Sequence, residues 1–232
     1  MIKISKRLTK VAEFVDERRI ADIGCDHGKL VEFLFETDSI DYAFVSDISE
    51  PSVKKAVKLL EENHRKFDWA VADGLQKIKE QHNIMQAIIS GMGGLEIINI
   101  LKNNKPNIMK FVLQPQNNEI TLKKFLVKNK YFIKKDIVVK DKNIFYNILS
   151  VEKTNKKMRL SKFDLLFGKN NFENNADFGL YLMYLKDKYE KILISVPSKT
   201  KYKIRIVIKK IKKALKKWEK CNGKNITISK DW

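Results

Sequence analysis

The sequence predicts an α/β fold with a largely parallel sheet, followed by a basic α-helical hairpin. Over about the first 150 residues, short apolar runs alternate with longer amphipathic stretches, which is typical of parallel strands joined by crossover helices. Beyond about residue 155, apolar residues recur three and four positions apart, the period of a helix. We therefore expect one domain at 1–155 and a second, helical domain at 156–232.

Five short apolar runs of the first domain are expected to form strands. They are RRIADIG (18–24), YAFVSDI (42–48), DWAVAD (68–73), MQAIISG (85–91) and KFVLQP (110–115). Helical patterns separate them at about 28–37, 51–63, 94–103 and 118–128. Each strand is followed by a helix, so the strands are expected to run parallel.

The end of the first domain has a different pattern. Residues 131–153 form two strand-like runs joined by the charged turn Lys140-Asp141-Lys142, and no helical pattern separates them. This predicts a hairpin that adds an antiparallel edge strand to the sheet.

The second domain begins with a connection that holds a short helix and an Asn-rich segment. Residues 178–196 then repeat apolar side chains at helical spacing, Val196-Pro197-Ser198 interrupts them, and 200–221 resumes the pattern. Two helices joined by a short break predict a helical hairpin or short antiparallel coiled coil. The apolar stripe of the second helix consists of Ile204, Val207, Ile208, Ile211, Leu215 and Trp218.

The charge of the chain is unevenly distributed. The formal net charge is +19, but residues 1–100 carry −3, residues 101–155 carry +8 and residues 156–232 carry +14. A uniform bias toward lysine would spread evenly, so the two halves are expected to bind different partners. Nucleic acid is the usual partner of such a basic tail; an anionic membrane surface and a merely solvated lysine face are the alternatives.

The composition excludes several classes of protein. No run reaches the ~18 apolar residues that a membrane-spanning helix needs, and no long apolar segment follows the N-terminal charges, as a signal peptide would require. Two separate cysteines, Cys25 and Cys221, indicate neither a disulfide framework nor a metal site. We expect a cytoplasmic, monomeric protein without a metal.

The turn after the first strand, Asp22-Ile23-Gly24-Cys25-Asp26-His27-Gly28, has the form of a nucleotide-binding loop. Glycines let the backbone approach a ligand, but the dinucleotide fingerprint G-x-G-x-x-G is absent. Two carboxylates would repel a diphosphate, whereas S-adenosylmethionine carries an ammonium and a sulfonium and no phosphate. The alternative is that Asp26 only caps the following helix.

Further acidic residues follow the next two strands. Asp47 ends the second strand, where a carboxylate can accept hydrogen bonds from ribose hydroxyls, and Asp73-Gly74 ends the third, within reach of an adenine. The carboxyl ends of parallel strands meet at one edge, which is where open sheets bind ligands. The spacing therefore favours one nucleoside site.

Two segments complete this edge. Ser90-Gly91-Met92-Gly93-Gly94 ends the fourth strand, and its glycines indicate either close approach to a ligand or tight packing of a helix. Gln114-Pro115-Gln116-Asn117 follows the fifth, where side-chain amides either contact a base or shape a turn.

With these motifs together, the sequence resembles the bacterial tRNA adenine-22 N1-methyltransferases along its whole length. The resemblance rests on Ser5-Lys6-Arg7-Leu8, the Asp22–His27 turn, Asp73-Gly74-Leu75, Gly91-Met92-Gly93-Gly94 and Gln114-Pro115. It implies a Rossmann-like, seven-stranded class I methyltransferase sheet, S-adenosylmethionine as methyl donor, tRNA as acceptor and 1-methyladenosine as product.

The resemblance also implies roles for particular residues. Gly24, Cys25 and Asp26 would line the methionine end of the donor, Asp47 would hold its ribose, and Asp73-Gly74 its adenine. Arg7 would meet the donor carboxylate or an RNA phosphate. The full set expected to bind the donor is Arg7, Asp22, Gly24, Cys25, Asp26, Gly28, Asp47, Ile48, Asp73, Gly74, Gly91 and Met92, and the lysines expected to bind RNA are Lys209, Lys210, Lys212, Lys213, Lys216 and Lys217.

The chemistry of the acceptor suggests catalytic roles for Asp26 and His27. Methylation of the ring nitrogen N1 makes adenine positively charged, so a nearby carboxylate can stabilise the product or accept a proton. His27 can assist, pack or contact phosphate. Methyltransferases acting on exocyclic amines often carry Asn/Asp-Pro-Pro-aromatic after the fourth strand, and this chain has Ser-Gly-Met-Gly-Gly, which favours a ring nitrogen.

Three other functions fit the sequence less well. A small-molecule methyltransferase has no need of a basic tail, and a nicotinamide oxidoreductase needs the diphosphate fingerprint that this loop lacks. A non-catalytic RNA-binding module would not need the acidic residues that follow three successive strands.

Overall fold

The computed structural model describes residues 1–104, 108–155 and 157–223. These residues form two compact units. Unit 1 comprises residues 1–135 and 146–159, and unit 2 comprises residues 136–145 together with the chain from residue 160 onward. The tip of a hairpin, 136–145, groups with the helical unit, whereas the sequence-based division near residue 155 had placed the whole hairpin in the first domain.

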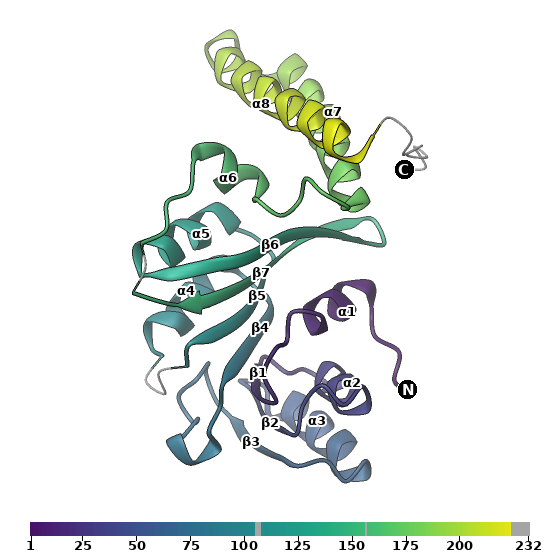
Figure 1. Cartoon of the computed structure of the whole chain (residues 1–232), viewed down its shortest axis with the longest axis vertical. Coiled ribbons are helices and arrows are strands. Elements are labelled where there is room, and N and C mark those ends of the chain that lie inside the picture. Colours follow the sequence, from purple (N-terminus) through teal and green to yellow (C-terminus); the bar gives the residue numbers. More distant parts are fainter. Residues whose placement is uncertain (105–107, 156, 224–232) are drawn as a thin grey trace. The chain divides into compact units, whose positions relative to one another are not determined.

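The sheet has seven strands in the order β3-β2-β1-β4-β5-β7-β6 (Figure 1). The strands from β3 to β5 pair in parallel, and β7 pairs antiparallel to β5. The strands are β1 (Arg19–Ile23), β2 (Tyr42–Asp47), β3 (Phe67–Val71), β4 (Gln86–Met92), β5 (Lys110–Pro115), β6 (Tyr131–Asp141) and β7 (Ile144–Lys153). The predicted sheet and hairpin are confirmed, but the antiparallel strand lies between β5 and β6, because β6 occupies the edge.

Helices cover both faces of the sheet in unit 1, with α1, α2 and α3 on one face and α4 and α5 on the other (Figure 1). They are α1 (Lys6–Ala12), α2 (Lys29–Glu36), α3 (Glu50–Glu62), α4 (Gly94–Lys102) and α5 (Glu119–Lys128), with a short 3₁₀ turn, η1 (Glu80–His82). The four helices predicted between strands are confirmed to within two residues at each end. This arrangement leaves the carboxyl ends of the parallel strands along one edge of the sheet.

Local sequence explains where these helices begin. The Ser49 hydroxyl accepts a hydrogen bond from the Ser52 N–H at 3.4 Å, so Ser49 caps α3, and a proline lies in its first turn. Helix α1 was not predicted, although Ser5 caps it by accepting from the Leu8 N–H at 3.3 Å. Buried Val11 and Ala12 follow at helical spacing from Leu8, so the signal was present but short.

The central strands are buried on both faces, as parallel sheets require. Apolar residues of β1, β2, β4 and β5 supply this core. β3 is an edge strand, and there Trp69 is 51% and Val71 41% exposed. The core of unit 1 therefore lies on both faces of the central strands β1, β2, β4 and β5.

Unit 2 contains the predicted helical hairpin. Its helices are α6 (Lys162–Phe167), α7 (Ala176–Ser195) and α8 (Ser198–Asn222), and α7 packs against α8. Ile208, Ile211 and Trp218 of the predicted stripe are buried, Ile204, Val207 and Leu215 are half-buried, and Ala214 joins them. Gly179 lets α7 approach closely, since a Cβ there would lie 2.6 Å from the Trp218 ring.

The Asn-rich segment before α7 covers backbone groups at the hairpin tip. Asn171 is fully buried, and its Oδ1 accepts a hydrogen bond from the Val138 N–H at 2.7 Å. Asn170 and Asp177 accept in the same way from the N–H groups of Asp136 and Lys140, at 3.1 and 2.9 Å. These side chains replace a neighbouring strand along β6, which explains why the tip belongs to unit 2.

Within the part of the chain that the structure describes, no helix combines the length and apolar character needed to span a membrane.

Candidate active site

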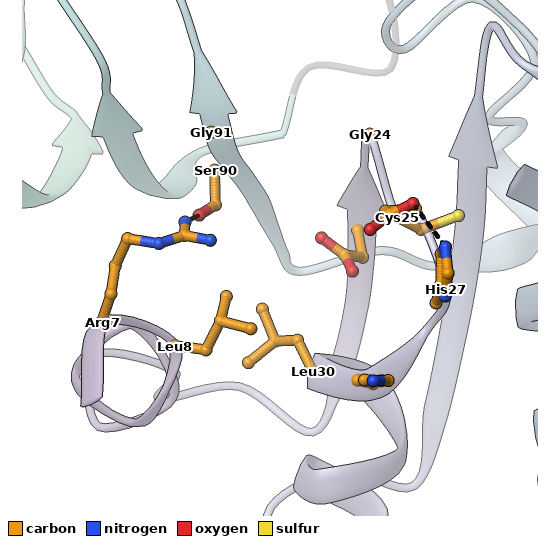
Figure 2. Close-up of a pocket in the computed structure, with 11 residues that line it drawn as sticks. Arg7, Leu8, Gly24, Cys25, His27, Leu30, Ser90 and Gly91 are labelled. Atoms are coloured by element: carbon orange, nitrogen blue, oxygen red, sulfur yellow. Dashed lines mark hydrogen bonds and ion pairs between the residues drawn. The ribbon is translucent and has the colours of Figure 1, made fainter. Parts of the chain in front are cut away.

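A pocket of about 400 Å³ opens at the carboxyl ends of β1 and β4 (Figure 2). Its walls come from α1, the turn after β1, the start of α2 and the end of β4. The residues that line it are Arg7, Leu8, Asp22, Gly24, Cys25, Asp26, His27, Lys29, Leu30, Ser90 and Gly91. Arg7, Asp22, Gly24, Cys25, Asp26 and Gly91 of the predicted donor set, together with His27, thus meet around one cavity.

The turn after β1 has unusual backbone geometry. Gly24, Asp26 and Gly28 all have positive φ, at +76°, +48° and +69°, a region that favours glycine. A Cβ at Gly24 would overlap the end of the Met92 side chain. Gly24 therefore leaves room for the end of the Met92 side chain beside the turn.

Asp22 is the buried acid of the pocket, with only 4% of its surface exposed. Burial, and then the nearby negative charge of Asp47, raise the pKa of its carboxyl group to about 7. A bound cation would favour the ionised form and reverse this shift. The residue is thus suited to holding an ammonium group.

Asp47 holds the turn in place. Its Oδ2 accepts a hydrogen bond from the Asp26 N–H at 3.2 Å, and its Oδ1 accepts from the Ser49 N–H at 2.9 Å. Each carboxylate oxygen retains a second lone pair. Asp47 can therefore anchor the loop and still accept from a ribose.

Asp26 lies at the tip of the turn with 75% of its side chain exposed. Its Oδ1 is 3.2 Å from His27 Nε2, and Lys55 Nζ lies 3.5 Å from the same nitrogen. The N-cap of α2 is Gly28, with no side-chain cap bond. The alternative in which Asp26 caps the helix is therefore wrong, because Gly28 occupies the capping position.

Arg7 forms the opposite wall, and Figure 2 shows its side chain reaching from α1 toward Ser90. Its Nη1 donates to Ser90 Oγ at 2.8 Å and to Gln114 Oε1 at 2.5 Å. Gln114 is fully buried, and its amide nitrogen donates to the Pro115 carbonyl at 3.0 Å. A buried amide thus fixes the position of Arg7, and Gln114 does not meet a base.

The predicted ribose and adenine residues lie along the same edge but outside the pocket lining. Ile48, just after β2, has 72% of its surface exposed. Asp73 is exposed, whereas Gly74 is buried, with φ +62°. A Cβ at Gly74 would lie 3.1 Å from Ile100 of α4, so this glycine has a packing reason as well.

The glycines after β4 divide between ligand approach and helix packing. Gly91 lines the pocket, whereas a Cβ at Gly94 would lie 2.6 Å from the Asn117 carbonyl oxygen. Asn117 in turn accepts from the Gly94 N–H at 3.3 Å. Gly91 thus serves the site, while Gly94 and Asn117 serve the packing of α4.

Packing and burial account for two further residues of the predicted set. A Cβ at Gly28 would lie 2.9 Å from that of Ala56, so Gly28 allows α2 to approach α3, and it does not line the pocket. Cys25 lines the pocket but is buried; burial, then Asp22 and Asp47, raise the pKa of its thiol. It is therefore a wall of the pocket rather than a nucleophile.

Four lining residues were absent from the predicted set. Leu8 of α1 and Leu30 of α2 point toward one another across the cavity (Figure 2). Lys29 and Ser90 complete the lining. Leu8 was missed because α1 was not predicted, and no local pattern shows that a helix will fold over a distant strand end.

The predicted RNA-binding lysines lie on α8, in unit 2. Lys209, Lys213, Lys216 and Lys217 are exposed and Lys210 is half-buried. Lys212 pairs with Glu190 of α7 at 3.1 Å, and Lys217 Nζ lies 4.0 Å from the centre of the Phe172 ring. Lys209, Lys213 and Lys216 are thus exposed, while Lys212 and Lys217, also exposed, already have contacts within unit 2.

Solved structures share this fold. The Streptococcus pneumoniae protein Sp1610, crystallised with S-adenosyl-L-methionine, is 30% identical, with a TM-score of 0.82 over 92% of this chain and 100% of its own. M. capricolum TrmK, solved in complex with S-adenosyl-homocysteine, is 26% identical, with a TM-score of 0.81 over 92% of this chain and 98% of its own.

Sequence comparison agrees with the structural one. The tRNA (adenine(22)-N(1))-methyltransferase of Bacillus subtilis is 28% identical over 158 residues, which cover 65% of this chain and 66% of the relative. The family model for TrmK, tRNA (adenine(22)-N(1))-methyltransferase, matches residues 20–220. This chain therefore belongs to the tRNA (adenine(22)-N(1))-methyltransferase family.

Proposed function

We propose that this chain methylates N1 of adenine 22 in tRNA, with the donor in the pocket between α1, β1 and β4 and the tRNA bound through α8. The observation that carries the proposal is the buried carboxyl of Asp22, whose pKa is raised to about 7 within a pocket of about 400 Å³. A buried acid of this kind requires a cation to ionise fully at neutral pH.

The residues fit S-adenosylmethionine. When bound, it supplies a methyl group made electrophilic by a positively charged sulfur. Asp22 would hold the ammonium, and Arg7, fixed by Ser90 and Gln114, would pair with the carboxylate of the same amino-acid end. Asp47 would accept hydrogen bonds from the ribose. Ile48 and Asp73, which follow the neighbouring strands β2 and β3, would border the adenine.

Asp26 acts on the acceptor. With the donor bound, the ring-plane lone pair of the neutral N1 would form the new bond to the methyl carbon as the carbon–sulfur bond breaks, so that the sulfur would leave as a neutral thioether and the ring would become positively charged. The exposed carboxylate of Asp26, held by Asp47 through its backbone N–H, stabilises that charge and accepts the proton that the acidified amine releases. His27, 3.2 Å from Asp26, orients this carboxylate.

The basic helix α8 binds the tRNA. Lys209, Lys213 and Lys216 are exposed along one helix and lie in a region of strongly positive charge, which favours contacts with phosphates. The target base must be flipped or already exposed, because N1 is engaged in base pairs. We place the protein, as a monomer, in the cytoplasm with its tRNA substrate.

The test is methyl transfer to an unmodified tRNA transcript with isotopically labelled donor, followed by nucleoside analysis. We expect labelled 1-methyladenosine with the transcript that carries adenine 22, and none with a matched transcript that carries guanine 22. Label in another nucleoside, or equal label in both transcripts, would refute the assigned position. Label that appears only in small molecules added from a cell extract would favour the small-molecule alternative.

A further inference from the structure

The exposed face of α8 carries two apolar side chains that the helical core does not need. Tyr202 has 71% and Ile206 39% of its surface exposed. Tyr202 lies nine residues before the buried Ile211, and Ile206 nine before Leu215 of the core. Nine residues are two and a half turns of a helix, so both point away from the core of unit 2.

Lysines surround these two residues on the same face. Lys199 lies three residues before Tyr202 and Lys203 lies three residues before Ile206, while Lys209, Lys210 and Lys213 continue the row beyond Ile206. From Lys199 to Lys217 this face is about 27 Å long. Lys199, Lys203, Lys209 and Lys213 are exposed, so they are available to a partner along much of that length.

The charge of the segment identifies the kind of partner. Residues 191–218 contain eleven lysines and arginines and neither aspartate nor glutamate. A second copy of the chain would bring the same positive charge against this face, which opposes self-association. A polyanion is favoured, and an aromatic ring among lysines is the pattern by which proteins bind unpaired bases of a nucleic acid.

We infer that the outer face of α8 is a composite RNA surface, on which Tyr202 stacks against an unpaired base while the lysines follow the phosphates. The inference rests on the proposed tRNA substrate and extends it. Lysines alone bind the phosphates of any RNA duplex. An aromatic ring in the same row favours a region of the RNA where a base is unstacked, such as a loop. Ile206 lies one turn further along and provides an apolar contact beside the ring.

The experiment measures the affinity of the full chain for an unmodified tRNA transcript at several salt concentrations. Tyr202→Ala should weaken binding at least about fivefold, because a base stacked on an aromatic ring contributes ~1 kcal/mol or more. The slope of log affinity against log salt should stay the same, since no charge is lost. Tyr202→Phe, the matched control, should bind within about twofold of wild type, because it keeps the ring.

Two further variants separate base stacking from a simple apolar contact and from charge attraction. Tyr202→Leu keeps apolar area without an aromatic ring and should bind tRNA as poorly as Tyr202→Ala. Lys203→Ala should instead reduce the salt slope by about one ion. Affinity of Tyr202→Ala within twofold of wild type would overturn the inference. So would a change in sedimentation from dimer to monomer with unaltered tRNA affinity, which would assign the face to a second copy.

The outcome is distinguishable from failure of the proposed function. If wild type makes no 1-methyladenosine, the proposed reaction is wrong whatever Tyr202 does. If wild type is active and Tyr202→Ala raises the KM for tRNA but leaves donor affinity and kcat at saturating tRNA unchanged, the proposed function and the role of Tyr202 are both supported. If wild type is active and Tyr202→Ala has wild-type KM for tRNA, only this inference fails.

Discussion

The pocket in unit 1 and the outer face of α8 in unit 2 carry charge of opposite sign in opposite surroundings. In the pocket, Asp22 is buried and its pKa is raised to about 7, so its charge depends on what binds beside it. On α8, lysines such as Lys209 and Lys213 are exposed to solvent. A small cation is selected by a desolvated acid at short range, whereas a polyanion is attracted by many solvated charges whose effect salt weakens.

The largest expected effect comes from the exposed acid of the pocket. Asp26→Asn should lower kcat by about 100-fold, the scale of a lost general base, while donor affinity changes little. Asparagine is the appropriate replacement because Asp26 has φ +48°, a conformation that asparagine tolerates. Single-turnover kinetics at saturating donor and tRNA measure this. Near wild-type turnover would remove Asp26 from the chemistry.

The buried acid should make donor binding depend on pH. Below about pH 7 Asp22 is largely neutral in the free protein and offers no charge to an ammonium, so donor affinity should rise about tenfold from pH 6 to pH 7.5. Calorimetric titration with S-adenosylmethionine over this range measures it. Asp22→Asn should bind weakly, without that rise; a variant that keeps the wild-type profile would contradict the assignment.

The same residue predicts how stability depends on pH. Its folded pKa, about 7, lies above the ~4 of an unfolded aspartate, so between these values the folded state binds more protons. The free energy of unfolding of the ligand-free protein should therefore fall as pH rises from about 4 to about 7. Urea unfolding at several pH values should show this fall reduced in Asp22→Asn. An unchanged dependence would mean that other groups control it.

The affinity for tRNA should depend on salt through the lysines of α8. Lys213→Ala combined with Lys216→Ala should reduce the slope of log tRNA affinity against log salt by up to about two ions. Lys212→Ala is the matched control: it lies on the same helix but pairs with Glu190, and it should change the slope by less than half an ion. If the wild type, the double variant and Lys212→Ala all have the same salt slope, Lys213 and Lys216 do not contact tRNA and the lysine face is only solvated.

The smallest effect is expected at His27. Its ring is 44% exposed and its contact with Asp26 spans 3.2 Å, so the interaction is worth at most ~1 kcal/mol. His27→Gln should reduce kcat by no more than about fivefold. A loss as large as that of Asp26→Asn in the same assay would make His27 a catalytic residue in its own right.

Much of the fold follows from local sequence. The strands of unit 1 and the stripe of α8 were predictable, because apolar periodicity and turn residues are local signals. The exceptions have physical reasons. α1 is only seven residues long, and the position of β7 inside the edge depends on which strand β5 pairs with. The Asn-rich segment was predicted as a connection, yet Asn171 pairs with backbone more than thirty residues away.

The candidate site was only partly predictable. The acidic residues after β1, β2 and β3 could be placed at one edge, because parallel strands bring their carboxyl ends together. The separate roles of Gly24, Gly28 and Gly94 could not, since a glycine needed for a ligand and one needed for helix packing look alike in sequence. Gln114 illustrates the same limit: a base contact and a turn were both open for it, and it is buried against Arg7.

By itself the sequence determined the alternation of strands and helices, the row of acids at the strand ends and the concentration of positive charge in the last third of the chain. Each of these depends on residues near one another in the chain. The tertiary structure decided which acid is buried, that Arg7 is held across the pocket by Gln114, and that Tyr202 faces away from the helical core. Burial and partnership arise only when distant segments pack together, and they set the pKa of Asp22 and the exposure of Tyr202.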